Sequence, residues 1–235
     1  MNGQLPVAQR HGGAGRTAAP WRRVTRGESR WPAATAVVAA SGLQMALPRS
    51  LSVGPHWLLP AAEIGLLCAL VASSPRRLER RSALLRTGGL VLAGLLSLAN
   101  ATSAALLVHD LAHGPPAQSA ATLLLAGGSI WAANVLIFAL WYWELDRGGP
   151  ADRCHAVRMY PDFLFPQMQQ PDVAPLDWKP FFTDYLYLSF TNAISFAASD
   201  VTPLTRWAKA MMMLQSAVSV AAIVLVTARA VNIIG

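Results

Sequence analysis

Long apolar runs separated by short polar breaks make up most of the chain. Six of these runs have the length of helices, and they lie at residues 32–48, 57–74, 88–109, 119–143, 181–199 and 207–231. The breaks contain residues that stop helices, such as Pro48, Pro55 and Pro75. The pattern predicts an all-α fold, a polytopic membrane helix bundle with about six transmembrane helices.

The same pattern divides the chain into four regions. Residues 1–30 are rich in Arg, Gly, Ala and Pro, which is typical of a disordered basic tail in the cytoplasm. Residues 31–145 contain four predicted helices, and residues 181–235 contain the C-terminal helix pair. Between them, residues 146–180 mix aromatic residues with Pro and Asp, which indicates a cytoplasmic or interfacial loop.

Composition and charge narrow the class of protein further. The chain is 54% hydrophobic and 13% charged, whereas a soluble domain has about 25% charged residues. The net charge of +7 comes without a nucleic-acid-binding motif, so we expect the lipid bilayer as the partner and no nucleic acid. With six spans and a cytoplasmic N-terminus, every Lys and Arg lies inside except Arg49, Arg206 and Lys209. This asymmetry predicts a multi-pass protein of the plasma membrane with its N-terminus inside.

The run at 181–199 combines the length of a membrane span with a polar stripe. Its 19 residues make a helix of about 28 Å, enough to cross a bilayer. Five polar side chains fall within less than a third of its circumference, namely Asp184, Thr191, Asn192, Ser195 and Ser199. Such a stripe has to face other helices or water, so we expect it to be the functional face.

Charge does not decide whether this segment crosses the membrane. If 181–199 dips in and returns to the cytoplasmic face, only Arg49 and Arg229 lie outside, which satisfies the orientation rule equally well. We expect a full crossing, because the segment is long enough and has no glycine or internal proline to turn it. Five spans plus a re-entrant segment is the alternative.

Two resemblances involve this part of the chain. The runs Asp184-Tyr-Leu-Tyr-Leu-Ser-Phe-Thr and Ser199-Asp-Val-Thr-Pro-Leu-Thr-Arg resemble a family of uncharacterised bacterial multi-pass inner-membrane proteins. That resemblance implies a bacterial inner-membrane location and no assigned activity. The stretch also looks like the pore region of two-span potassium channels, but both filter glycines are replaced, by Ala197 and Ser199. A filter of backbone carbonyls needs backbone angles that glycine adopts most easily, so potassium selectivity is not expected.

Other polar residues within the apolar runs are candidates for the same face. Glu63 lies inside the second run, where a carboxyl group indicates an ion or proton site, or a hydrogen bond to a neighbouring helix. We expect its partners to be the polar stripe, or Arg206 and Lys209. In the last run Gln215 and Ser219 share a face, a spacing typical of close helix packing against the stripe.

Metal binding and catalysis have little support in the sequence. His109 and His113 are four residues apart and could chelate zinc, but no third ligand is indicated. No hydrolase, nucleotide-binding or metalloprotease motif is present, so we expect neither a cofactor nor an enzyme. The favoured hypothesis is a channel- or transporter-like protein for a small ion or solute. The alternative is a non-transporting scaffold or accessory subunit, which forms a homo-oligomer or binds a partner subunit in the membrane.

Overall fold

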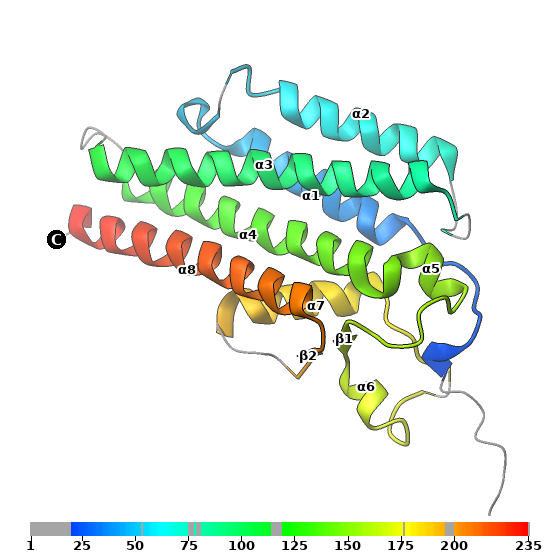
Figure 1. Ribbon diagram of the computed structural model, residues 1–235. Coiled ribbons are helices and arrows are strands. Elements are labelled where there is room, and N and C mark those ends of the chain that lie inside the picture. Colours follow the sequence, from blue (N-terminus) through cyan, green and yellow to red (C-terminus); the bar gives the residue numbers. More distant parts are fainter. Residues whose placement is uncertain are drawn as a thin grey trace, which may run out of the picture.

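The computed structural model describes residues 20–52, 54–74, 78, 81–113, 119–175, 177–195 and 200–234. This part of the chain is mostly helical, as expected (Figure 1). The helices are α1 (Trp31–Ala46), α2 (Leu58–Ser73), α3 (Ala83–His113), α4 (Ala120–Leu145), α5 (Pro150–Cys154), α6 (Pro166–Gln169), α7 (Phe182–Ser195) and α8 (Arg206–Ile234). The remaining elements are 3-10 turns at Pro20–Arg22, Arg49–Leu51 and Asp146–Gly148, and the strands β1 (Phe163–Leu164) and β2 (Thr202–Pro203).

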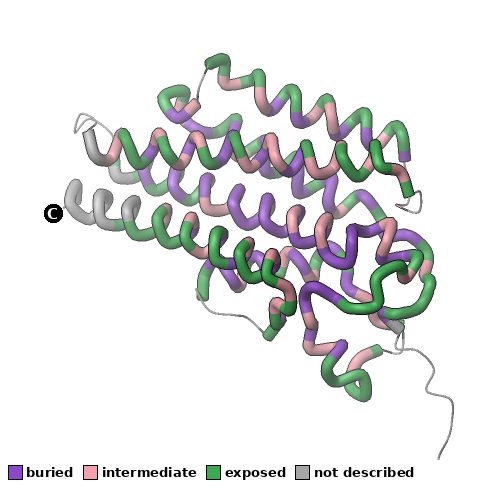
Figure 2. Tube along the Cα trace, viewed as in Figure 1, coloured by how far each residue is buried: buried purple, intermediate pink, exposed green. Residues whose placement is uncertain are grey.

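Helix α4 lies at the centre of the bundle (Figure 1). It packs against α1, α3, α7 and α8, whereas α2 lies further out and packs against α1 and α3. In the second half of α4, buried side chains lie on all sides of the helix, namely Ile137, Phe138, Ala139 and Leu140, and Figure 2 shows this half as mostly buried. An all-round apolar helix is suited to this position, because neighbours cover this half on every side.

The helix ends follow local sequence signals. Helix α4 begins after Ser119, whose hydroxyl accepts a hydrogen bond from the backbone N–H of Thr122 at 3.2 Å, as an N-cap serine does. Helix α1 ends at Ala46, because the next residue, Leu47, precedes Pro48 and adopts an extended conformation. Helix α3 is longer than the apolar run 88–109 and extends from Ala83 to His113. Its polar ends lie at the two ends of the bundle.

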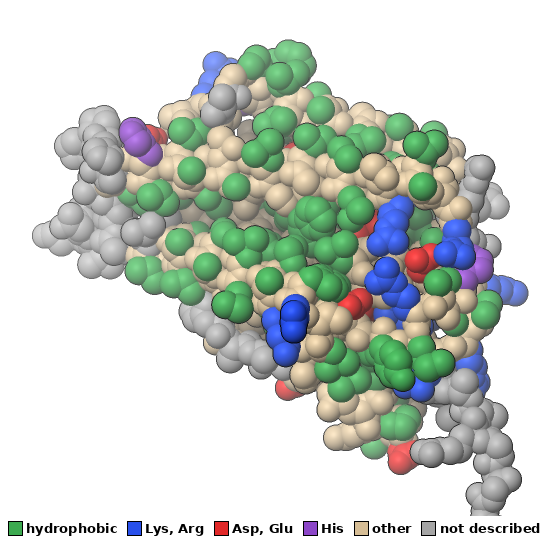
Figure 3. All heavy atoms as spheres, in the orientation of Figure 1, with side chains coloured by type: hydrophobic (Ala, Val, Ile, Leu, Met, Phe, Trp, Pro, Cys, Tyr) green, Lys and Arg blue, Asp and Glu red, His purple; other side chains and the backbone are tan. Residues whose placement is uncertain are grey.

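Within the described residues, three helices are long and apolar enough to cross a membrane: Ala83–Leu111, Ala121–Gly148 and Arg206–Val224. Helices α1 and α2 have 16 residues each, which is about 24 Å of helix. The outer surface carries many large apolar side chains (Figure 3), among them Val38, Leu98, Leu125 and Met213. An apolar exterior of this extent is compatible with a membrane protein.

Helix α7 covers 14 residues of the segment 181–199, and residues 196–199 lie outside the described part of the chain. Strand β2 and the start of α8 lie at the end of the bundle where α7 begins (Figure 1). Strand β2 pairs antiparallel with β1, with Phe163 opposite Pro203 and Leu164 opposite Thr202. This pairing holds the start of α8 at the end of the bundle where α7 begins. Local helix signals could not indicate it, because the strand pairing joins residues far apart in the sequence.

Residues 20–30 and 146–180 are also more ordered than expected. Trp21, Glu28 and Arg30 are buried, although they fall in the expected disordered tail. In the expected interfacial loop, Phe163 and Phe165 are buried and belong to the main hydrophobic core. Together these two segments form a folded cap over one end of the bundle. Residues 1–19 lie outside the described part of the chain.

Candidate functional site

Gln215 of α8 is the centre of a buried polar network between α4, α7 and α8. Its Oε1 accepts hydrogen bonds from the Tyr142 hydroxyl at 2.6 Å and from Asn192 Nδ2 at 2.9 Å. Its Nε2 donates to the carbonyl of Ser189 at 2.9 Å and to the Ser189 hydroxyl at 2.7 Å. Gln215 is fully buried, and its two donors and two acceptor positions are all used.

The neighbouring polar groups are satisfied as well. Asn192 Nδ2 also donates to the carbonyl of Met212 at 3.0 Å, and the Ser189 hydroxyl donates to the carbonyl of Val135 at 2.6 Å. One turn further along α8, Ser219 Oγ accepts a hydrogen bond from Asn134 Nδ2 at 3.0 Å. These bonds use the polar groups to hold three helices together, which is the usual role of buried amides and hydroxyls inside membrane bundles.

The predicted polar stripe of α7 does not act as one face. Asn192 joins Gln215, and Ser219 extends the same network. Asp184 instead caps the start of α7, where its Oδ2 accepts a hydrogen bond from the backbone N–H of Phe181 at 2.7 Å. The Thr191 hydroxyl donates to the carbonyl of Tyr187 within its own helix at 2.9 Å, and Ser195 is exposed. Ser199 lies outside the described residues.

Sequence reasoning missed two members of this network, Ser189 and Tyr142. Ser189 precedes Asn192 by three residues, so the helical period places both on one side of α7, and this signal was available. Tyr142 lies in an aromatic group at the end of an apolar run, which is also typical of a membrane interface. Only the position of Gln215 beside α4 identifies the Tyr142 hydroxyl as a buried donor.

Glu63 is fully buried, but away from the α7 stripe. The Ser41 hydroxyl of α1 donates to Glu63 Oε2 at 2.6 Å. With its amide oriented to satisfy both groups, Gln44 of α1 donates to Oε1 at 3.1 Å and to Oε2 at 3.2 Å. The expectation that Glu63 pairs with the stripe, or with Arg206 and Lys209, is therefore wrong. Glu63 joins α2 to α1.

The structure describes only one side chain of the histidine pair. His109 Nδ1 lies 3.7 Å from Asp110 Oδ1, and the side chain of His113 is outside what the structure describes. No group of three or more potential metal ligands occurs among the described residues.

A cavity of about 550 Å³ opens at the end of the bundle near α5. Helices α1, α2, α3 and α4 supply its apolar walls, and charged residues line it as well. Basic and acidic side chains gather over the same end of the molecule (Figure 3). A volume of this size lies within the range of small-molecule sites.

Two charged groups in this cavity have unsatisfied hydrogen-bonding capacity. Arg30 is 8% exposed, and Glu144 projects against α3 at Gly89, where an added Cβ would lie 2.6 Å from Glu144 Oε1. Within the described residues, neither the Arg30 guanidinium nor the Glu144 carboxylate has a hydrogen bond or a close ion pair, although the two charges attract each other. Burial lowers the pKa of Arg30, and the nearby Glu144 carboxylate opposes that shift. The cavity therefore contains a buried cation and a carboxylate that a ligand can bind.

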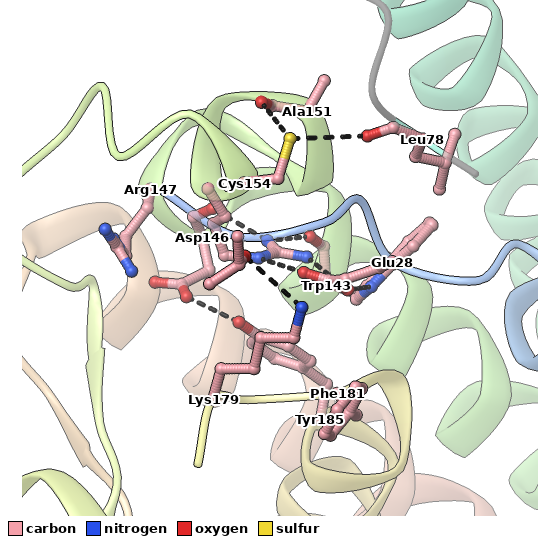
Figure 4. A network of polar contacts seen from close by, with 12 residues as sticks. Glu28, Leu78, Trp143, Asp146, Arg147, Ala151, Cys154, Lys179, Phe181 and Tyr185 are labelled. Carbon is pink, nitrogen blue, oxygen red and sulfur yellow. Dashed lines mark hydrogen bonds and ion pairs between the residues drawn. The ribbon is translucent and has the colours of Figure 1, made fainter. Parts of the chain in front are cut away.

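The folded cap is held by a second buried polar cluster (Figure 4). Arg153 donates to Glu28 Oε1 at 3.0 Å and Oε2 at 3.2 Å, and to the carbonyls of Trp143 at 2.6 Å and Asp146 at 2.9 Å. Trp143 Nε1 also donates to Glu28 Oε2 at 2.6 Å. Burial alone would lower the pKa of Arg153. The Glu28 carboxylate, the Tyr185 hydroxyl and the Asp146 carboxylate favour the charged guanidinium more strongly than burial disfavours it, so the pKa is raised.

Two aspartates connect this cap to the starts of α7 and α8. Asp146 accepts a hydrogen bond from the Tyr185 hydroxyl at 2.6 Å (Figure 4). It also accepts one from the backbone N–H of Asp162 at 2.9 Å. Asp162 in turn accepts from Trp207 Nε1 at 2.9 Å and from the backbone N–H of Arg147 at 2.8 Å. The beginnings of α7 and α8 are therefore bonded to the same end of α4. None of these residues was among the predicted site residues, although Tyr185 directly follows Asp184.

Comparisons with known proteins add no family and no fold relative. No protein-family model matches the chain, and no curated protein and no solved structure matches it.

Proposed function

We propose that this chain is a multi-pass plasma-membrane protein with five crossing helices, α1–α4 and α8. Helix α7 is then a re-entrant segment that enters and leaves at the cytoplasmic face. Charge supports this orientation, because five crossings with the N-terminus inside leave only Arg49 and Arg229 of all Lys and Arg on the external side. The short α1 and α2 are accommodated by modest local thinning of the bilayer.

Cysteine labelling tests this topology. In a background with Cys68→Ala and Cys154→Ala, Thr202→Cys is expected to react with a membrane-impermeant maleimide from the cytoplasmic side only, because Thr202 is exposed and lies beside β1. Asp172→Cys and Ser50→Cys mark the cytoplasmic and external sides, since both positions are exposed. Labelling of Thr202→Cys from the side of Ser50→Cys would establish six crossings instead.

Within this topology, we propose that the protein is channel- or transporter-like and binds a small ion or solute in the cavity near α5. The observation that carries this proposal is Arg30, a buried guanidinium without a hydrogen-bonding partner among the described residues in a cavity of about 550 Å³. A buried cation without hydrogen bonds is costly. The nearby Glu144 carboxylate offsets part of that cost, and a bound solute that accepts hydrogen bonds from Arg30 offsets more of it. The polar stripe is the weaker candidate for this role, because its buried members hydrogen-bond to one another.

Flux from proteoliposomes tests this function. We expect protein-dependent release of at least one among protons, potassium, small organic anions and small zwitterions. Arg30→Gln should reduce the rate at least about tenfold, since a hydrogen bond to a charged group contributes about 1.5–3 kcal/mol. Arg206→Gln is the matched control, because Arg206 is exposed at the same end of the bundle. Rates equal to those of empty liposomes for the whole panel would refute the proposal.

A scaffold or accessory role is the second candidate. The closed network around Gln215 favours it, since such a network stabilises helix packing and leaves no polar group to contact a solute. This role predicts no flux and a cross-linked partner, either a second copy or another membrane subunit. Membership of the family of uncharacterised bacterial inner-membrane proteins is part of the proposal and is compatible with both roles. In both, α7 enters from the cytoplasm, opposite to the pore helix of potassium channels.

A further inference from the structure

The cavity near α5 has walls of two different kinds. Small and branched apolar side chains line its inner part, namely Ala33, Ala34, Val37, Leu67, Leu70 and Leu92. Charged side chains line the rest, with Arg30, Arg81, Arg86, Glu144 and Asp152. A ligand that fills both parts has a hydrocarbon portion and a charged head, which is the chemistry of an amphiphile.

The charges in the cavity are not equivalent. Asp152 Oδ1 lies 2.9 Å from Arg81 Nε, and Asp152 Oδ2 lies 3.7 Å from Arg86 Nη1. These three groups form their own cluster, and the arginines are 57% and 41% exposed. Arg30 and Glu144 remain, one cation and one anion. A head group with a single negative charge supplies no hydrogen-bond donor to Glu144, which is attracted by Arg30, Arg86 and Arg153 but accepts no hydrogen bond among the described residues. A zwitterionic head supplies an acceptor for Arg30 and a donor for Glu144.

The position of the cavity agrees with a lipid head group. It lies at the end of the bundle with the folded cap, where the basic side chains gather (Figure 3). In the proposed topology this is the level of the cytoplasmic head groups. The apolar walls between α1, α2 and α3 continue from that level towards the middle of the bundle, the direction in which acyl chains run.

We propose that this cavity binds an amphiphile whose head carries a phosphate and a protonated primary amine. The phosphate accepts hydrogen bonds from Arg30, the ammonium donates to Glu144, and the hydrocarbon chain lies against Ala34, Leu70 and Leu92. This inference rests on the proposed function, because it assigns the ligand class of the same cavity. Gly89 is part of the site, since any side chain there displaces the Glu144 carboxylate.

Titration calorimetry in detergent micelles tests the assignment with four probes. Lysophosphatidylethanolamine carries the whole proposed pattern, lysophosphatidylglycerol lacks the amine, lysophosphatidylcholine lacks its N–H donors, and phosphoethanolamine lacks the chain. We expect lysophosphatidylethanolamine to bind at least about tenfold more tightly than each of the others, as expected from one charge-assisted hydrogen bond or a buried chain.

Variants separate the two parts of the site. Arg30→Gln should weaken lysophosphatidylethanolamine binding at least about tenfold, and Glu144→Gln should remove its advantage over lysophosphatidylglycerol. Ala34→Leu fills the apolar part and should weaken all three lipids while leaving phosphoethanolamine unchanged. Arg206→Gln, exposed at the same end, is the control and should bind like the unaltered protein. A thermal melt of each variant shows that it is folded, and Arg30→Gln removes no hydrogen bond within the described chain.

Each contrary result has a definite meaning. Equal binding of the three lipids, unaffected by Arg30→Gln, overturns the inference, because only the chain would then be recognised. Binding of phosphoethanolamine as tight as that of the lipid also overturns it, in favour of a water-soluble zwitterion. If either result is obtained and the protein still produces flux in proteoliposomes, the ligand class is wrong but the proposed transport function stands. Specific lipid binding without any flux refutes transport and supports the ligand class.

Discussion

Arg153→Met is expected to lower the free energy of unfolding by about 3–5 kcal/mol, as the loss of one partner of a buried ion pair does. The substitution leaves Glu28, 6% exposed, with only the indole N–H of Trp143 as a donor among the bonds described. It also removes the donors to the carbonyls of Trp143 and Asp146 at the end of α4. Unfolding by a denaturing detergent in mixed micelles, followed by tryptophan fluorescence, measures the change.

The controls for this prediction lie within the same cap. Arg158→Met changes an exposed arginine and should alter the free energy of unfolding by less than about 0.5 kcal/mol. Adding Glu28→Gln to Arg153→Met should recover part of the loss, because the uncompensated buried charge is then removed. A loss below about 1 kcal/mol for Arg153→Met alone would show that water reaches Glu28 and that the cap is open.

Gln215→Leu is expected to lower the free energy of unfolding by about 2–4 kcal/mol, because each unsatisfied buried polar group costs about 1–3 kcal/mol. The substitution leaves the Tyr142 hydroxyl without its acceptor. The Ser189 hydroxyl and carbonyl lose the Gln215 amide as a donor, although the hydroxyl still donates to the carbonyl of Val135. Asn192 keeps the carbonyl of Met212 as an acceptor, so Asn192→Leu should cost less than Gln215→Leu.

Hydrogen exchange locates the effect of Gln215→Leu. The backbone amides of α7 should exchange faster while those of α3 keep their protection, because α7 is bonded to the bundle through this network. Met213→Leu is the control, since Met213 is 73% exposed on the same helix. Unchanged exchange in α7 would mean that apolar contacts alone hold the helix in place.

Part of the candidate site could be predicted from sequence because it depends on local period. Asn192 lies on the polar face of α7, and Gln215 and Ser219 share a face of α8, and both faces follow from about 100° per residue in a helix. The structure places these three residues in one network. The partner of Glu63 could not be predicted in this way. Which helix lies beside α2 depends on how the loops fold back, and Ser41 and Gln44 lie in α1.

The residues of the cavity near α5 could be predicted from sequence even less. Arg30 falls in a segment whose composition indicates a disordered tail, and Glu144 falls in an aromatic helix end. Their side chains line one cavity only because α1, α3 and α4 meet at the end covered by the cap. No spacing in the sequence relates the two residues.

The sequence by itself determined the helical class, the approximate extents of the long helices and an apolar exterior suited to a membrane, because these depend on hydropathy and on local helix signals. Tertiary structure decided where α8 begins relative to α7. A strand pair between β1 and β2, with Asp146 and Asp162 bonded to Tyr185 and Trp207, brings the start of α8 back beside the start of α7. Such pairings join residues far apart in the chain, and only the assembled bundle brings them within hydrogen-bonding distance.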